Sequence, residues 1–194
     1  SYEALDSVFQ EELQSEEAAI AQTSGPGIQP GTTGSAVTGS GASTSGSAAA
    51  TSPAAVKPPA PKPVPIGILT IDKIKLKLPI LSGATNRNMK VGVGWLKETT
   101  PIGEVGNTAL AAHRSYTYGR FFNRLDEVVV GDRFQIEAAG KIYEYEVFQK
   151  LVVLPTDTSV LKRNNRDHIV TLITCTPIRK ATHRLIIQAK LIEQ

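Results

Sequence analysis

The sequence predicts an all-β fold, a closed or nearly closed barrel of about seven or eight short strands, preceded by a long segment outside the barrel. Two observations indicate this. From residue 66 onward, short apolar runs recur about every 8–12 residues with little helix among them, a spacing typical of barrels. Residues 23–65 contain no Leu and no aromatic residue, so they cannot form a core. The 194 residues suffice for one ordinary domain with a tail.

The first part of the chain, residues 1–22, is acidic. It carries six Asp and Glu residues and no Lys or Arg. Leu5, Val8, Phe9 and Leu13 recur at a helical spacing, which indicates a helix. Because a helix of this length is marginal in water without a packing partner, we expect a solvated helix or a frayed tail.

The second part, residues 23–65, is predicted to be a disordered linker. It holds seven of the 16 Gly and eight of the 12 Pro residues, and most of the others are Ser, Thr or Ala. We expect flexible coil in the Gly/Ser part, 31–52, and a stiffer polyproline-like spacer over 53–65. A passive spacer is the simplest interpretation. The alternative is that the acidic residues 1–22 are attracted to the basic remainder of the chain and form an inhibitory lid.

The third part, residues 66–194, has the apolar runs and alternating patterns of a globular domain. Residues 121–128 are a candidate for a short helix, and 91–95 lie near a glycine-containing loop. Alternating apolar and polar residues indicate half-buried strands at 74–80 and 142–147. The segments that we expect to form strands are 68–71, 74–80, 107–112, 129–140, 141–154, 168–174 and 184–192.

Charge and cysteine content exclude several classes of function. Residues 66–194 carry 19 basic and 12 acidic residues, a net charge of +7, but the basic residues are interspersed with acids rather than clustered as in a nucleic-acid binder. A single cysteine excludes an internal disulfide framework and a multi-cysteine zinc site. No run reaches the roughly 18 apolar residues of a membrane span. Since Ser1 is not an initiator Met, we expect the chain to begin downstream of a removed segment.

The lone cysteine, Cys175, is the first candidate for chemistry. It follows the apolar run 169–174 and precedes Thr176-Pro177, so it lies where a buried strand emerges at a surface rim. A free cysteine is often only a small buried hydrophobic residue. An unpaired thiol at the surface needs a functional reason, so we predict that Cys175 is a functional, partly exposed thiol.

A thiol nucleophile needs a base or a cationic neighbour. His113 ends the strand 107–112, whereas His168 lies in a charged turn and His183 at the start of the last strand. His113 and Cys175 are therefore the pair most expected to meet, each at the exit of an apolar strand. Arg184 has a permanently charged fork of donors that suits an oxyanion, although surface ion pairing is the usual role of an arginine.

Three segments of the chain resemble the sortases, the Gram-positive cysteine transpeptidases that attach proteins to the cell wall or build pili. Residues 171–175, Thr-Leu-Ile-Thr-Cys, match the TLxTC pattern of that family. Ala112-His113-Arg114 is similar to its histidine segment, usually Gly-His-Arg, and residues 182–186 to its arginine strand. The order and separations of the three motifs also fit, and the resemblance covers residues 66–194. Residues 113–125 look most like class D sortases.

The resemblance implies a closed eight-stranded β-barrel with short helices, and it implies roles for individual residues. Cys175 would be the nucleophile, His113 the general acid and base, and Arg184 the donor to the oxyanion. Thr174 would contact the substrate near the scissile bond, although it is equally well explained as a plain strand residue. No cofactor or metal is expected. Some sortases bind calcium, but no motif in this sequence indicates a calcium site.

By the same resemblance, the substrate would be an LPxTG-like sorting signal of a secreted surface protein, cleaved after Thr. The acyl group would pass to an amine of a peptidoglycan precursor or to a pilin lysine. The protein would act at the extracellular face of a Gram-positive cell membrane, anchored through a span upstream of Ser1. Three alternatives remain open: a class C pilin-polymerising sortase, a cysteine hydrolase, and a non-catalytic β-barrel surface domain on a wall-spanning stalk. A class C enzyme typically carries an Asp-Pro-aromatic lid motif, which does not occur before residue 66.

Overall fold

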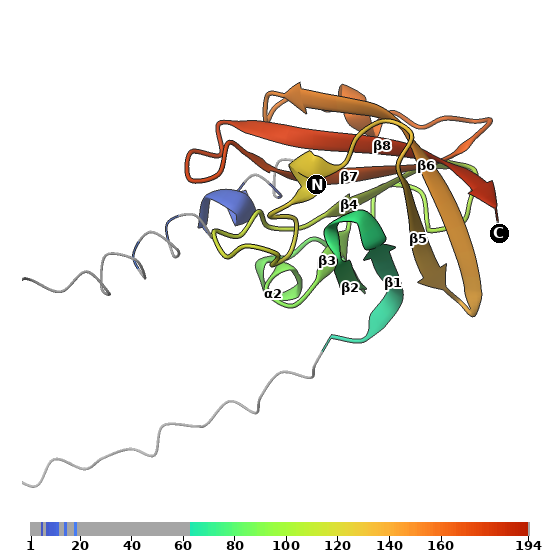
Figure 1. Ribbon diagram of the computed structural model, residues 1–194, viewed down its shortest axis with the longest axis horizontal. Coiled ribbons are helices and arrows are strands. Elements are labelled where there is room, and N and C mark those ends of the chain that lie inside the picture. Colours follow the sequence, from blue (N-terminus) through green and yellow to red (C-terminus); the bar gives the residue numbers. More distant parts are fainter. Residues whose placement is uncertain (1–4, 6, 12–13, 15–17, 19–62, 194) are drawn as a thin grey trace, which may run out of the picture.

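The computed structural model describes Leu5, residues 7–11, Gln14, Ala18 and residues 63–193. Eight strands form a closed barrel in the order β1-β2-β3-β4-β7-β8-β6-β5 (Figure 1), which confirms the predicted fold class. The strands are β1 (Pro65–Ile71), β2 (Leu76–Ser82), β3 (Val93–Trp95), β4 (Gly106–Ala111), β5 (Arg133–Ala138), β6 (Lys141–Val153), β7 (His168–Thr176) and β8 (His183–Glu193).

The sheet is mixed. β2 with β3, and β4 with β7, run parallel, and the remaining neighbours are antiparallel, with β1 and β5 closing the barrel. The hairpin between β5 and β6 turns at Ala139 and Gly140, both at positive φ. The short helices are η1 (Asp72–Ile74), α2 (Asn86–Met89), η2 (Leu125–Glu127) and η3 (Ser159–Leu161). The helix expected over 121–128 is thus shorter than predicted, since the segment before η2 folds as turns.

Side chains that alternate along each strand divide between the barrel interior and its outer face. The interior holds one apolar cluster, to which β4, β7 and β8 contribute Leu110, Leu172 and Ile187 among others. A second cluster lies on the outer face of the same three strands and includes Ala109, Ile173 and Ile186. A strand that is buried on both faces has apolar residues at successive positions, which explains why residues 169–174 form an apolar run without alternation. Something must therefore cover this outer face.

Two segments cover the outer face of β4, β7 and β8. Toward the start of β7, η3 does so: Asn107 donates to the Val160 carbonyl oxygen at 2.9 Å and accepts from the buried Thr171 hydroxyl at 2.7 Å. At the other end of β7, the N-terminal helix lies beside the loop between β7 and β8 (blue in Figure 1). Leu5 and Phe9 of that helix are 2% and 1% exposed and belong to the outer cluster.

The expectation of a solvated or frayed N-terminal helix is therefore wrong at Leu5 and Phe9. The sequence showed the helical spacing, but the surface that these residues pack on forms only when the barrel closes. The predicted linker falls almost wholly on residues 19–62, which lie outside the described residues, so its disorder stays a prediction. In the part of the chain that the structure describes, none of the helices has the length and apolar character needed to cross a membrane.

Candidate active site

The end of β7 brings Cys175 and His113 side by side. β4 and β7 are parallel with Ala111 opposite Ile173, and the Ala112 amide continues the ladder by donating to the Ile173 carbonyl oxygen at 3.2 Å. Continuing this register by two residues places His113 opposite Cys175. In parallel strands, opposite residues project to the same face, here the outer face that holds Ala111 and Ile173. The register agrees with the pairing predicted from strand ends, and the catalytic roles of the two residues stay a prediction.

Arg184 completes the arrangement from the other side. β7 and β8 are antiparallel with Cys175 opposite Arg184, so the arginine also lies on the outer face. It is 1% exposed, and its Nη1 atom donates to the carbonyl oxygens of Ala181 and His183 at 2.9 and 3.0 Å. Cys175 therefore lies on β7 between two neighbouring segments. His113 follows β4 on one side, and Arg184 on β8, whose guanidinium is fixed by two carbonyl oxygens, lies on the other.

Burial sets the protonation of the cysteine and the histidine. Cys175 is 6% exposed, and its burial raises the pKa of the thiol to about 12, against the opposing charge of Arg114. His113 is 4% exposed, and its burial, followed by the nearby charge of Lys90, lowers the pKa of the imidazole to about 4. Both groups are neutral at pH 7 in this state. The expected partial exposure of Cys175 is wrong, because the N-terminal helix packs over the site.

Comparisons with known proteins establish the family. A family model described as Sortase domain matches residues 69–192. The chain belongs to the sortase family. It is 31% identical over 127 residues to Sortase A of Bacillus anthracis, covering 66% of this chain and 60% of that protein. It is also 31% identical to Sortase D of Bacillus subtilis, covering 64% and 62%. The matched region thus spans about 60% of the length of these curated relatives.

Among solved structures, this sortase is similar to class C members. Sortase C1 of Pilus Island 1 of group B Streptococcus superposes with a TM-score of 0.64 at 38% identity, covering 67% of this chain and 66% of that one. Sortase C of Streptococcus pneumoniae superposes with the same TM-score at 29% identity, covering 67% of each chain. Relatives named A, C and D thus all match. The class D assignment expected from residues 113–125 is not singled out by these similarities.

Arg114 links the segment that contains His113 to the residue after Cys175, a contact that the sequence analysis did not predict. Its side chain is 7% exposed, and Nη1 donates to the Thr176 hydroxyl at 2.9 Å, directly after Cys175 in the chain. Nη2 pairs with Asp126 at 2.8 Å, and Nε donates to the Asn123 carbonyl oxygen at 3.3 Å. The only sequence signal was the Arg that follows His113 in the family motif.

The loop after Arg114 is held by its own polar groups. The Phe122 amide donates to the His113 carbonyl oxygen at 3.0 Å. The Asn123 side chain donates to the Ser115 carbonyl oxygen at 2.6 Å and is 8% exposed. These bonds return the chain to the barrel immediately after His113, so the backbone of the histidine is fixed on both sides.

Thr174 alternates with Cys175 along β7 and so lies on the opposite face from the thiol. It is fully buried, and its hydroxyl donates to the Ala112 carbonyl oxygen at 2.8 Å, next to His113. This bond again ties β7 to the histidine segment. The contact between Thr174 and substrate that the resemblance implied stays a prediction.

The two remaining histidines lie apart from this face. His183 is opposite Thr176, one residue beyond the Cys175–Arg184 pair, and its Nδ1 lies 2.9 Å from the Thr182 hydroxyl. His168 begins β7, about 20 Å from Cys175 for seven residues of strand. Within the described ranges, no group of three or more His, Cys, Asp or Glu side chains is arranged to hold a metal ion.

Proposed function

We propose that this sortase is a cysteine transpeptidase that cleaves an LPxTG-like sorting signal after Thr and transfers the acyl group to an amine. The observation that carries the proposal is the juxtaposition of Cys175 with His113 and Arg184 on one outer face, made by the registers of β4, β7 and β8. A thiol, an acid–base group and a charged donor are the parts that covalent amide exchange requires.

In the first half-reaction, the Cys175 thiolate attacks the carbonyl carbon of the Thr residue and forms a tetrahedral adduct. Arg184 donates hydrogen bonds to the oxygen as it acquires negative charge. The C–N bond then breaks, His113 gives its proton to the departing amine, and a thioester remains on Cys175. The thiolate needs the site to be more polar than the covered state, in which burial raises the pKa of the thiol to about 12.

In the second half-reaction, an incoming amine attacks the thioester carbonyl carbon. His113, now neutral, takes a proton from the attacking nitrogen, and the adduct collapses by breaking the C–S bond. The Cys175 thiolate leaves and a new amide is released, so the enzyme returns to its initial state. Excluding water from the thioester favours the amine over hydrolysis.

For the amine, we propose a peptidoglycan precursor, with a pilin lysine as the second candidate. The second candidate is supported by the likeness to Sortase C1 of Pilus Island 1 at 38% identity. The same proposal places the protein at the extracellular face of a Gram-positive cell membrane, held by an N-terminal span upstream of Ser1.

Incubation of the full chain with LPxT-type peptides and a panel of amines, followed by mass analysis of the products, tests the proposal. We expect cleavage after Thr and an amine-dependent ligation product, both absent in Cys175→Ala. Cleavage that yields only the free acid with every amine supports the hydrolase instead. Absence of cleavage, together with a thiol that is inert toward small alkylating agents in folded Phe9→Ala protein, supports the non-catalytic surface domain; Phe9 belongs to the apolar cluster that contains Cys175.

A further inference from the structure

Thr171 opens the segment Thr-Leu-Ile-Thr-Cys, and the proposed reaction gives it no part. It is fully buried and shares the outer face of β7 with Cys175. Its hydroxyl donates to Asn107 Oδ1 at 2.7 Å and accepts from Gln188 Nε2 at 3.2 Å. The adjacent strands β4, β7 and β8 each contribute one of these side chains. Asn107, Thr171 and Gln188 thus form one hydrogen-bonded group, the Thr171 network.

The side-chain amides of the Thr171 network bind the backbone of η3. Asn107 Nδ2 donates to the carbonyl oxygens of Val160 and Lys162 at 2.9 and 3.2 Å. Gln188 Nε2 donates to the Val160 carbonyl oxygen at 3.0 Å. These carbonyl groups lie at the end of a single helical turn, where the backbone has no intrahelical donor for them. The network therefore supplies donors that η3 lacks and holds η3 by its backbone.

Packing alone leaves room beside η3. The connection that contains η3, residues 154–167, belongs to no ladder of the described barrel. A hollow of about 200 Å³ is lined by Leu161 and Arg163 of this connection and by Thr99 and Pro101 of the loop between β3 and β4. Hydrogen bonds depend on direction as well as distance, so the amides of the Thr171 network specify one position of η3, which packing next to a hollow does not.

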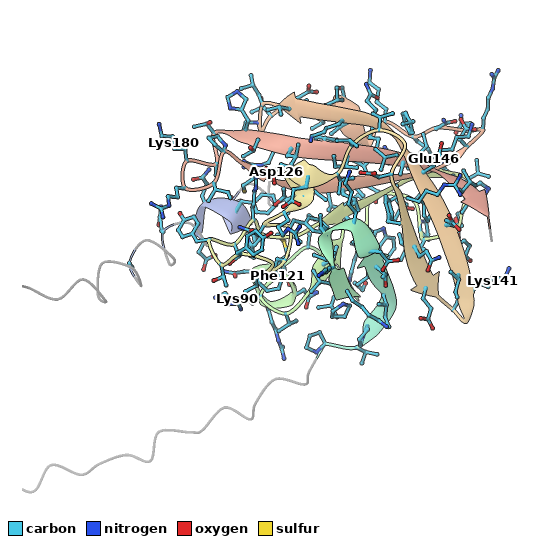
Figure 2. The ribbon with its side chains drawn as sticks, viewed as in Figure 1. Lys90, Phe121, Asp126, Lys141, Glu146 and Lys180 are labelled. Atoms are coloured by element: carbon cyan, nitrogen blue, oxygen red, sulfur yellow. The ribbon has the colours of Figure 1, made fainter. Side chains whose placement is uncertain are left out.

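The same helical turn borders the surface that leads to Cys175. Val160 belongs to the apolar cluster that contains Cys175, and Leu161 packs against that cluster. β7 ends one residue after Cys175, and the loop that follows it, which carries Lys180 in Figure 2, turns back into β8. The outer face of β7 therefore continues from Cys175 only toward the start of the strand, and Thr171 lies four residues along it, about 13 Å away. A peptide that extends from Cys175 over this face meets η3.

We propose that Asn107, Thr171 and Gln188 are positioning residues, which hold η3 on the outer face in the place where the sorting-signal peptide packs against it. The proposal rests on the proposed function, since it concerns binding of the same peptide. When the network is broken, η3 leaves this place for part of the time, and the apparent affinity for the peptide falls by the fraction of molecules in which η3 is in place. The rate of the bound complex should not change, because the register that brings Cys175 to its partners does not involve η3.

Thr171→Val removes the central hydroxyl of the network and keeps the shape of the side chain. We expect the KM for an LPxT-type peptide to rise about 3- to 10-fold, the net effect of one buried hydrogen bond, with kcat within twofold of wild type. Thr171→Ser keeps the hydroxyl and should restore the wild-type KM. Asn107→Ala removes three bonds and should raise KM further. Gln188→Ala, at the half-buried end of the network, should raise KM in the same way and serves as a second variant if Thr171→Val does not fold.

The matched control is Thr108→Val. Thr108 is a threonine of β4 that is 1% exposed, and its hydroxyl donates to the Pro101 carbonyl oxygen at 3.0 Å instead of joining the network. It loses one buried hydroxyl bond, as Thr171→Val does, but it should leave KM within twofold of wild type. Thermal unfolding of each variant verifies that the barrel is intact.

Hydrogen–deuterium exchange of the full chain reports the position of η3 without relying on activity. We expect the backbone amides of residues 154–167 to exchange faster in Thr171→Val and Asn107→Ala than in wild type and Thr108→Val, with exchange in β4 and β7 unchanged. Unchanged exchange over 154–167 in the folded variants overturns the positioning role. A loss that appears in kcat alone, with KM unchanged, also overturns it.

Binding of a fluorescent LPxT-type peptide, measured by anisotropy, separates this proposal from the proposed function. Faster exchange with weaker binding in a protein that cleaves nothing sustains the positioning role and defeats the transpeptidase. Cleavage with the exchange and the KM of Thr171→Val both unchanged does the reverse. A wild-type protein that neither binds nor cleaves the peptide defeats both.

Discussion

Replacing Arg114 tests whether the buried guanidinium positions His113 and Cys175 relative to each other. Its three contacts differ in strength. The pair with Asp126 involves a carboxylate side chain that is 53% exposed, so it is worth about 0.2–1 kcal/mol. The bond to the Thr176 hydroxyl is short and charge-assisted, and it contributes about 1.5–3 kcal/mol. The bond to the Asn123 carbonyl oxygen is longer, at 3.3 Å, and weaker.

The expected effect of Arg114→Ala follows from these contacts. We expect the free energy of unfolding to fall by about 2–4 kcal/mol, the sum of the two stronger contacts. If half of that loss appears as misplacement of the histidine relative to the thiol, kcat falls about 5- to 30-fold. The peptide KM should change little, because Arg114 is buried behind the site rather than on the outer face.

The assay is initial-rate cleavage of an LPxT-type peptide, with kcat and KM determined separately. It uses a Phe9→Ala background, which removes the ring that packs against His113 and Arg184. Asp126→Ala is the matched control, since it breaks only the exposed ion pair and should stay within about threefold of the parent. Arg114→Lys should recover part of kcat through one remaining bond. The reasoning is refuted if Asp126→Ala is as impaired as Arg114→Ala, or if Arg114→Ala changes KM alone.

Four further predictions concern residues at or next to the proposed site. Arg184→Ala should lower turnover on the order of 10²–10³-fold, as for loss of an oxyanion donor, and Arg184→Lys should restore little of it. His183→Ala should keep turnover within a few-fold of the parent. The opposite ranking of the two variants in steady-state assays contradicts the observed register. The rate of Cys175 alkylation in the full chain should still increase with pH at pH 10, because burial raises the pKa of the thiol to about 12. In Phe9→Ala, the pH profile of this rate should move to lower pH. Coincident profiles for the two proteins contradict the prediction. Thr174→Val should lower kcat several-fold through the lost bond to the Ala112 carbonyl oxygen, without a change in cleavage position as read by mass spectrometry. Burial lowers the pKa of His113 from 6.5 to about 4, so between these pH values the unfolded chain binds a proton that the folded chain does not. The free energy of unfolding should therefore fall as the pH falls from about 6.5 to about 4. His113→Gln should flatten that part of the profile of melting temperature against pH.

Local sequence patterns were sufficient for most of the barrel. The expected strand 129–140 contains β5, whose residues alternate between exposed and buried, and the apolar run 169–174 forms the centre of β7. The hairpin turn at Ala139-Gly140 was marked by its glycine. The helix expected over 121–128 is shorter than predicted. The Phe122 amide donates to the His113 carbonyl oxygen and the Asn123 side chain donates to the Ser115 carbonyl oxygen, so the segment before η2 folds as turns. Such long-range bonds leave no periodic trace in the sequence.

The catalytic face was predictable only in part. The motifs around His113, Cys175 and Arg184 selected these residues as candidates, and strand ends predicted that the first two meet. A cover supplied by residues 1–22 was only the alternative to a passive spacer, and it was argued from charge rather than from Leu5 and Phe9. Leu5 and Phe9 showed helical spacing, but their partners come from β4, β7 and β8, far away in sequence, and that surface exists only after the barrel closes. The run 169–174 is apolar on both faces of the expected strand, and this pattern indicates that the outer face of β7 is also buried.

The central claim is that Cys175 carries the acyl group during the reaction. Intact-mass analysis of the Phe9→Ala protein, mixed for short times with an LPxT-type peptide in the absence of amine, measures this directly. We predict an adduct with the mass of the peptide up to and including Thr, located on Cys175 by fragmentation and released as a hydroxamate by hydroxylamine. Cleavage of the peptide with no adduct at any time, or with undiminished rate in Cys175→Ala, would contradict the account.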